Sequence, residues 1–303
     1  MIDYPALRAV AAIIQTGSFE KAARVLNVTP SAISQRVKQL EDRLGLVLIV
    51  RGTPCTATEK GAWLCRHMEH VGMLEDALFQ QLPGLAGTEP QRVTLNIATN
   101  ADSLGTWFIE ALARFTRETG YLVDVAVDDQ DHTAEWLQRG RVLAAVTGLS
   151  KPVSGCRRTP LGILRYRATA SPDFLARYCP DGVTADALTN APALVFNQKD
   201  RLQGQWLREN FGTDLVHPSH WLPSTHAFVD AALAGIGWGM NPDMLVNEHL
   251  AAGRLVELLP DTPVDIALDW QATRLSGQPL EALTRHVVAV ARKMLLPSPD
   301  GQR

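Results

Sequence analysis

One stretch of the sequence, SFEKAARVLNVTPSAISQRVKQLEDRLG from Ser18 to Gly45, constrains the fold more than any other. It predicts two short helices joined by a tight turn. The first begins at Ser18, whose hydroxyl suits an N-cap, and ends near Asn27. The second begins at Thr29 and Pro30, because a hydroxyl caps free N–H groups and proline needs none at the first helical position. Gly45 suits its end. The stretch therefore predicts a helix-turn-helix.

The second helix of this pair has an apolar side and a polar side. The polar side carries Ser31, Ser34, Gln35 and Lys38 at helical spacing. A merely solvated face is the alternative, but such faces usually hold pairs of long glutamate and lysine side chains. Small hydroxyls, an amide and a cation can instead reach base edges and phosphates in a major groove. We therefore predict that this helix binds double-stranded DNA.

A short wing and a long helix follow. The run LVLIVR and the segment GTPCTATEKG after it predict two short strands with a turn between them. Arg51 would then lie beside a minor groove or the phosphate backbone, and an ordinary surface arginine is the alternative. A long helix is predicted from residues 58–61 to about Leu82, where Pro83 and Gly84 end it.

The long helix carries an apolar stripe. Its members are Leu64, Val71, Leu74, Leu78 and Leu82. A helix of this length between two domains must bury such a stripe on a partner, and a second copy of itself is the simplest partner. The sequence therefore predicts a homodimer, or a dimer of dimers forming a homotetramer, in which two helix-turn-helix units read a near-palindrome.

Charge divides unevenly along the chain. The formal net charge is −3, but residues 1–66 hold nine lysine and arginine residues against five acidic ones. The remainder holds 20 basic and 27 acidic residues. Positive charge is therefore concentrated where phosphates would bind, and the acidic remainder lowers nonspecific attraction to DNA.

Composition and motifs exclude several classes of protein. No apolar run approaches a membrane span and no export signal is evident, so we expect a cytoplasmic protein without membrane contact. The four cysteines are widely spaced without a C-x-x-C, which disfavours a disulfide or zinc site. His217, His220 and His226 lie among prolines without fixed ligand spacing, so no metal is expected. No nucleophile motif or dinucleotide fingerprint is present, so we expect neither an enzyme nor a cofactor.

From residue 92 onward, strands and helices alternate, which predicts an α/β domain with a parallel sheet. Strands are predicted near residues 93–98, 123–127, 143–147, 193–196, 236–240 and 264–270. Helices are predicted near residues 103–118, 133–139, 203–210, 225–234, 242–250 and 280–295. In such folds a ligand binds at the carboxyl ends of strands.

The residues from Leu7 to Gly61 resemble the N-terminal domain of LysR-type transcriptional regulators at nearly every apolar and turn position. The resemblance implies a winged helix-turn-helix, a long dimerising linker helix, and a two-lobed α/β effector domain like that of periplasmic binding proteins. The implied boundaries are 1–60 for the DNA-binding domain, 61–90 for the linker helix and linker, and 91–303 for the effector domain, with lobe I at about 91–167 and 271–303 and lobe II at about 168–270.

The helix face and this resemblance together predict the DNA contacts. They are Ser18, Thr29, Pro30, Ser31, Ser34, Gln35, Lys38, Arg51 and Thr58. The strand ends and the resemblance predict an effector pocket. Its residues are Asn100, Asp102, Ser103, Trp107, Asp128, Asp129, Thr147, Asn197, Ser224, Thr225, Trp238 and Trp270. Hydroxyls and N–H groups would hold a carboxylate, whereas aspartates and aromatic faces would hold an ammonium or guanidinium group. An acidic helix start is the alternative for Asp128, and the hydrophobic core is the alternative for Trp238 and Trp270.

The motifs NADSLGTW, VDDQDH, LQRGRVLAAVT, CPDGVTADAL and LAGIGWG resemble the ArgP/LysG branch of the LysR-type family. This resemblance implies an effector, L-lysine or L-arginine, and control of genes for amino-acid export or metabolism. Where this sequence has Asp128 the family would place glutamate, which leaves both amino acids open. The implied partners are DNA, the effector, further copies of the chain and RNA polymerase.

A second function remains, a two-lobed solute-binding module without a DNA role, because it would share the architecture of the second domain. The absence of an export signal and the basic helix-turn-helix favour the regulator.

Overall fold

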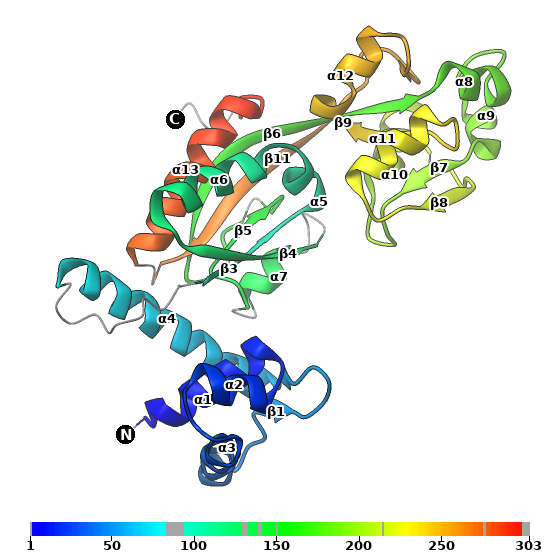
Figure 1. Ribbon diagram of the computed structural model, residues 1–303. Helices are drawn as coiled ribbons and strands as arrows, with labels where there is room; N and C mark the ends of the chain where they lie inside the picture. The colour runs from blue at the N-terminus through cyan, green and yellow to red at the C-terminus, as the bar shows by residue number, and fades with distance from the viewer. Residues whose placement is uncertain are drawn as a thin grey trace.

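The computed structural model has a helix-turn-helix at one end and a two-lobed α/β domain at the other, joined by the long helix α4 (Figure 1). The residues that it describes are 2–82, 94–128, 133–138, 141–149, 151–213, 215–274 and 277–298.

Helices and a two-stranded wing form the N-terminal domain. These elements are α1 (Tyr4–Thr16), α2 (Phe19–Val25), α3 (Pro30–Leu44), β1 (Ile49–Val50) and β2 (Thr56–Ala57). Ser18 and Thr29 cap α2 and α3, and each hydroxyl accepts a hydrogen bond from the backbone N–H three residues later. Gly45 ends α3 in the left-handed conformation, with φ at +65°. Ile33 and Val37 are fully buried in a core that belongs to this domain alone. The predicted helix-turn-helix is confirmed.

Helix α4 (Glu59–Gln81) packs on both domains. Near its start, half-buried Leu64 packs against the helix-turn-helix core. Farther along, Met73 is buried in the core of the α/β domain. In addition, Asn96 Nδ2 donates a hydrogen bond to Glu69 Oε1 at 2.7 Å. The predicted linker at 84–90 lies outside the described residues.

The main sheet is mixed, whereas the sequence predicted a parallel one. Its strands are β3 (Thr94–Thr99), β4 (Leu122–Val127), β5 (Ala144–Thr147), β6 (Cys156–Ala170), β9 (Gly239–Pro242), β10 (Val256–Glu257) and β11 (Val264–Thr273). Strand β3 is parallel to β4 and β5, but β11 is antiparallel to β5 and β6. The order is β10-β6-β11-β5-β3-β4, with β9 also pairing with β6. The prediction fails at β6 and β11 because the chain crosses between the lobes on this antiparallel pair.

Lobe I comprises β3, β4, β5 and the helices that cover them. Those helices are α5 (Ala101–Ser103), the π-helical turn η2 (Leu104–Phe108), α6 (Ile109–Thr119), α7 (Thr133–Gln138) and α13 (Gln278–Met294). Figure 1 shows α6 and α13 side by side on one face of the sheet. The helix predicted at 103–118 therefore starts two residues earlier and contains a π-helical turn.

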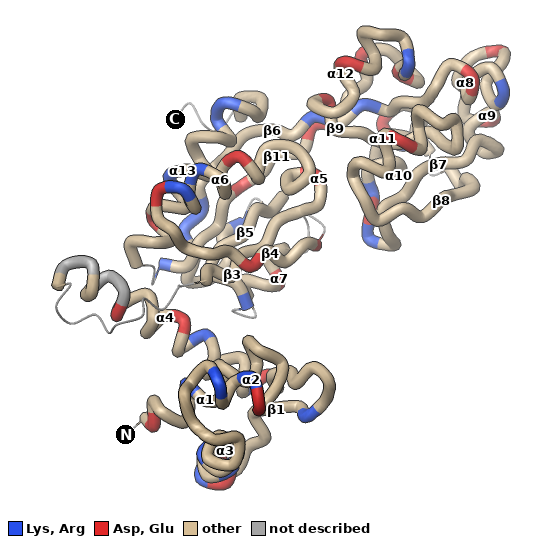
Figure 2. The backbone as a smooth tube through the Cα atoms, viewed as in Figure 1, with Lys and Arg blue, Asp and Glu red and all other residues tan. Residues whose placement is uncertain are grey.

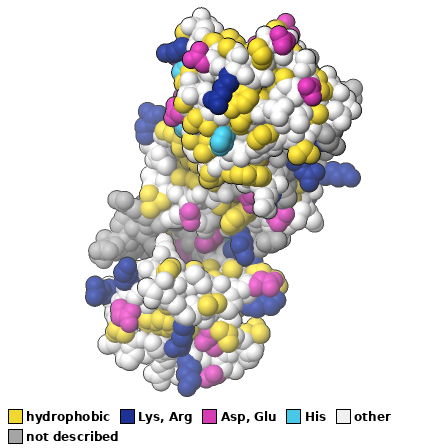
Figure 3. All heavy atoms as spheres, turned by 90° about the vertical axis from the view of Figure 1, so that its right-hand side faces the viewer, with side chains coloured by type: hydrophobic (Ala, Val, Ile, Leu, Met, Phe, Trp, Pro, Cys, Tyr) yellow, Lys and Arg dark blue, Asp and Glu magenta, His cyan; other side chains and the backbone are white. Residues whose placement is uncertain are grey.

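Lobe II comprises a parallel pair of short strands and the helices around it. These elements are β7 (Ala193–Val195), β8 (Ser219–Trp221), α8 (Pro172–Tyr178), α9 (Ala185–Asn190), α10 (Leu202–Phe211), α11 (Thr225–Leu233) and α12 (Asp243–Ala251). The strand predicted at 236–240 begins later, at Gly239. A Cβ at Gly237 would lie 2.8 Å from Leu194 Cδ2, so this glycine permits close packing on β7. Hydrophobic side chains gather on the outer face of lobe II (Figure 3).

Candidate functional site

The exposed face of α3 carries the predicted DNA-reading side chains. Ser31, Gln35 and Lys38 are exposed and Ser34 is half-buried, while Ile33 points into the core. Lysine and arginine segments occur along α3 and in the loop after β1 (Figure 2). In the space-filling view, basic side chains stand out from the helix-turn-helix end of the molecule (Figure 3). This arrangement allows α3 to enter a major groove with polar groups leading.

Arg51 lies at the wing, where its guanidinium carbon is 5.3 Å from the centre of the Phe19 ring. The side chain is exposed, so its cation remains available to a phosphate. Thr58 differs. Its hydroxyl donates to Val47 O at 2.8 Å and accepts from Gly61 N at 3.1 Å, which caps α4. Thr58 therefore caps α4, as Ser18 and Thr29 cap α2 and α3, and its predicted DNA contact stays a prediction.

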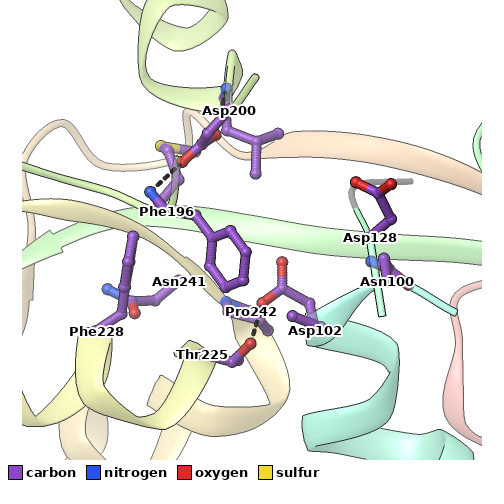
Figure 4. Close-up of a pocket in the computed structure, with 12 residues that line it drawn as sticks. Asn100, Asp102, Asp128, Phe196, Asp200, Thr225, Phe228, Asn241 and Pro242 are labelled. Atoms are coloured by element: carbon purple, nitrogen blue, oxygen red, sulfur yellow. Dashed lines mark hydrogen bonds between the residues drawn. The ribbon is translucent and has the colours of Figure 1, made fainter. Parts of the chain in front are cut away.

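A pocket lies between the lobes, at the carboxyl ends of β3 and β4. It is lined by Asn100, Ala101, Asp102, Asp128, Phe196, Asp200, Leu202, Thr225, Phe228, Met240, Asn241 and Pro242. Figure 4 shows these side chains converging from strand ends and helix starts of both lobes. Three of them are aspartates, and none of the described lining residues is a lysine or arginine.

Asp102 joins the two lobes through hydrogen bonds. Its Oδ2 accepts from the Tyr166 hydroxyl on β6 at 2.8 Å. Its Oδ1 accepts from the Thr225 hydroxyl at the start of α11 at 2.6 Å (Figure 4). Burial raises the pKa of Asp102, although the two hydrogen bonds act against that rise. Nearby Asp200 raises it further. Because the described pocket lining holds three aspartates and no lysine or arginine, no lining cation neutralises the Asp102 carboxylate.

Asp128 is the second predicted carboxylate that reaches the pocket. Its Oδ2 accepts from Trp136 Nε1 at 3.2 Å, and its Oδ1 lies 3.2 Å from Lys199 Nζ. Asp129, which was predicted to act beside it, lies outside the described residues.

Residues 5–62 match the lysR family of bacterial regulatory helix-turn-helix proteins, and residues 88–295 match the LysR substrate binding domain. The chain belongs to the LysR family. The family assignment made from the sequence is confirmed, as is the two-lobed fold.

Similar proteins are named as regulators. The HTH-type transcriptional regulator ArgP of Pseudomonas fluorescens is 43% identical over 298 residues, 98% of this chain and 99% of that protein. ArgP from Mycobacterium tuberculosis has a solved structure that is 40% identical, with a TM-score of 0.81, and the match covers 98% of this chain and 100% of that one. Full-length LysG from Corynebacterium glutamicum with bound effector Arg is 35% identical, with a TM-score of 0.70 and the same coverage.

These matches confirm a LysR-type transcriptional regulator rather than an enzyme or a solute-binding module without a DNA role. None of the helices that the structure describes is long and apolar enough to cross a membrane.

The tryptophans predicted to hold the ligand in this LysR-family regulator lie elsewhere. Trp107, Trp238 and Trp270 are fully buried in the hydrophobic core and do not line the pocket. Trp270 Nε1 donates to Thr284 Oγ1 at 2.9 Å, which holds the ring against α13. The cation–π role predicted for these residues is therefore corrected to core packing.

Of the hydroxyl and amide side chains predicted for the pocket, some line it and others do not. Thr147 is fully buried, and its hydroxyl accepts from Leu149 N at 3.0 Å. Ser224 caps α11, and Asn197 Oδ1 accepts from Lys199 N. Ser103 is buried beside the pocket but does not line it. Asn100 and Thr225 do line it, as predicted.

Several lining residues of this LysR-family pocket were not predicted from the sequence. Asp200 accepts from Phe196 N at 2.9 Å and from Leu202 N at 3.1 Å, so it shapes the loop before α10. An aspartate two residues before a predicted helix is a signal for such a turn, but it gives no sign of facing lobe I. Phe228 and Asn241 belong to lobe II elements and carried no local signal.

Proposed function

We propose that this LysR-family regulator binds operator DNA as a dimer through α3 and the wing, and that arginine or lysine in the inter-lobe pocket controls it. In this proposal residues 1–60 read DNA, α4 and the linker dimerise, and residues 91–303 bind the effector. The regulated genes would serve amino-acid export or metabolism, with RNA polymerase as a further partner in the cytoplasm.

The observation that supports a basic effector is the charge of the pocket. Asp102, Asp128 and Asp200 line it, and no described lining residue carries a positive charge. A cationic ligand would offset the desolvation cost of the ionised Asp102 carboxylate, because opposite charges stabilise each other strongly in a desolvated site. LysG of Corynebacterium glutamicum, whose structure holds arginine, has the same fold over the whole chain.

The polar end of such a ligand also has a place in the pocket. Both Oδ1 and Nδ2 of Asn100 are buried without a hydrogen-bond partner among the described residues. A buried polar group left unpaired is costly, so a ligand that supplies the missing partners would gain affinity. The carboxylate of an amino acid can accept from Nδ2, and its α-ammonium can donate to Oδ1.

The first prediction tests this effector assignment with matched ligands. Titration calorimetry on the full-length protein should give saturable binding of L-arginine or L-lysine, with one ligand per chain. Citrulline and norleucine match their shapes without the distal charge, and each should bind at least about tenfold more weakly than its charged counterpart. If neither basic amino acid binds, or if the neutral analogues bind equally well, the effector proposal is wrong.

The second prediction separates base reading from phosphate binding. Gln35→Ala should reduce discrimination between operator and random duplex by about 1–3 kcal/mol, because the amide would contact a base edge. Arg51→Ala should weaken binding to all sequences and reduce its salt dependence, because a phosphate contact carries no sequence information. Fluorescence anisotropy at several salt concentrations measures both effects. Equal losses on operator and random DNA for Gln35→Ala would exclude it as a base reader.

A further inference from the structure

An ion pair links the two lobes beside the pocket. Lys199 lies in the loop between β7 and α10 of lobe II, and its Nζ is 3.2 Å from Oδ1 of Asp128, which follows β4 in lobe I. The side chain of Lys199 is 46% exposed and that of Asp128 is 24% exposed. Asp128 thus faces both the pocket and a cation supplied by the protein itself.

The loop that carries Lys199 is held by its own hydrogen bonds. Asn197 Oδ1 accepts from Lys199 N at 2.7 Å, and Asp200 N donates to Asn197 O at 3.1 Å. The Asp200 carboxylate accepts from Phe196 N and Leu202 N. These contacts fix the backbone at Lys199 with its ammonium toward lobe I. The side chain itself is long and partly exposed, so it can leave Asp128 without a change in this backbone.

Asp128 is equally well oriented. Its backbone N donates to Thr99 O at 3.2 Å, and Trp136 Nε1 donates to its Oδ2. The other oxygen, Oδ1, therefore points to the position that Lys199 Nζ takes. A cationic ligand that approaches Asp128 from the pocket therefore finds Oδ1 already ion-paired with Lys199.

We propose that Lys199 is an internal cation that occupies Asp128 in the ligand-free protein and is displaced by the cationic group of the effector. This inference rests on the proposed function and adds its regulation: exchange at Asp128 raises the effector concentration at which the regulator responds. The apparent affinity equals the intrinsic affinity multiplied by the fraction of molecules in which Lys199 is away from Asp128.

The character of the pair fits exchange rather than permanent bracing. Lysine pairs that are half exposed contribute little net stability, and a displaced ammonium regains water. Arg167 offers the contrast within the same chain. It is only 22% exposed and bonds both Asp243 and Glu257, so it braces lobe II.

The test is a set of arginine titrations by calorimetry on full-length variants. Lys199→Met keeps the side-chain stem and removes the charge, so it should tighten binding by about three- to fivefold, the scale of a weak exposed pair. Lys199→Gln should act in the same direction, and the thermal midpoints should show that both variants are folded. Lys151→Met removes an exposed lysine elsewhere on the protein and should leave the affinity unchanged.

Asp128→Asn shows whether the effect of Lys199 acts through the Asp128 carboxylate. In that background Lys199→Met should no longer tighten binding, because the competition needs the carboxylate. Tightening that persists there would overturn the proposal, as would unchanged or weaker binding in Lys199→Met while the wild type binds arginine. The latter result leaves the effector assignment intact. If neither the wild type nor Lys199→Met binds arginine or lysine, both proposals fail, whereas binding by Lys199→Met alone would support displacement in its strongest form.

Discussion

Asp102→Asn is expected to weaken binding of arginine or lysine by at least about tenfold, because removing a charged partner from a desolvated site typically costs about 2–5 kcal/mol. The side chain is half-buried, lines the pocket and lies between the lobes. Titration calorimetry on the full-length variant measures the loss. Operator binding without effector should be retained, since Asp102 lies in the α/β domain and not in the helix-turn-helix. Normal arginine affinity in this variant would remove Asp102 from the site.

The same variant should keep its fold and gain stability near neutral pH. The pKa of Asp102 is raised, chiefly by burial, so the folded state favours the protonated carboxyl. The contribution of Asp102 to the free energy of unfolding is therefore fully present below its pKa in the unfolded chain, and it is lost as pH rises through its pKa in the folded protein. Asparagine stays neutral at every pH and can still pair with Tyr166 and Thr225, whose hydroxyls both donate and accept. A thermal midpoint well below that of the wild type would contradict this account.

Effector binding by the wild type should follow the opposite trend with pH. A cationic ligand prefers ionised Asp102, so affinity should fall as pH is lowered through the raised pKa of this group. Binding near that pKa should release protons, which calorimetry in buffers of different ionisation enthalpy detects. Asp102→Asn should lack this proton release, which separates Asp102 from the other acidic groups of the pocket.

The N-terminal domain could be predicted from the sequence because its signals are local. Ser18, Thr29 and Gly45 cap helices within a few residues of themselves, and the structure confirms each cap. No strand was predicted across β6, because Pro160 and Gly162 interrupt its pattern and several arginines lie along it. Those arginines pair with acidic residues about 100 positions away, such as Arg165 with Asp265, which no local window contains.

In the pocket, too, the residues with a local sequence signal could be predicted and the others could not. Asp102 and Asp128 could be predicted because both lie just beyond the carboxyl ends of lobe I strands, where ligands bind; Asp128 directly follows β4, and Asp102 lies in α5, shortly after β3. Asp200 and Asn241 could not, since only the approach of lobe II brings them to the same pocket. For the tryptophans, side-chain chemistry suits both a cation site and a core, and packing alone decides between them. Trp238 contacts the ring of Trp206 at 5.4 Å between centroids, inside lobe II.

Replacing Leu74 and Leu78 together with aspartate is expected to separate the proposed dimer into monomers. Both lie on α4, one turn apart, and they are 66% and 45% exposed in the single chain. Val71, one turn before Leu74, is half-buried beside a groove between α4 and α1. Buried leucines are worth about 1.5–3 kcal/mol each, and in a twofold interface each substitution acts twice. The dimer could therefore lose roughly 6–12 kcal/mol.

Light scattering coupled to size-exclusion chromatography measures the mass directly, and circular dichroism shows whether α4 remains helical. Val216→Asp is the matched control, because this valine of lobe II is 88% exposed and lies outside the stripe. It should leave the dimer intact. The double variant should bind a single half-site weakly and lose the gain that the wild type obtains from a second half-site, since two recognition helices must be joined to act at one operator. A double variant that stays dimeric would place the main dimer contact outside α4, and the exposed stripe would then have to be covered by another surface.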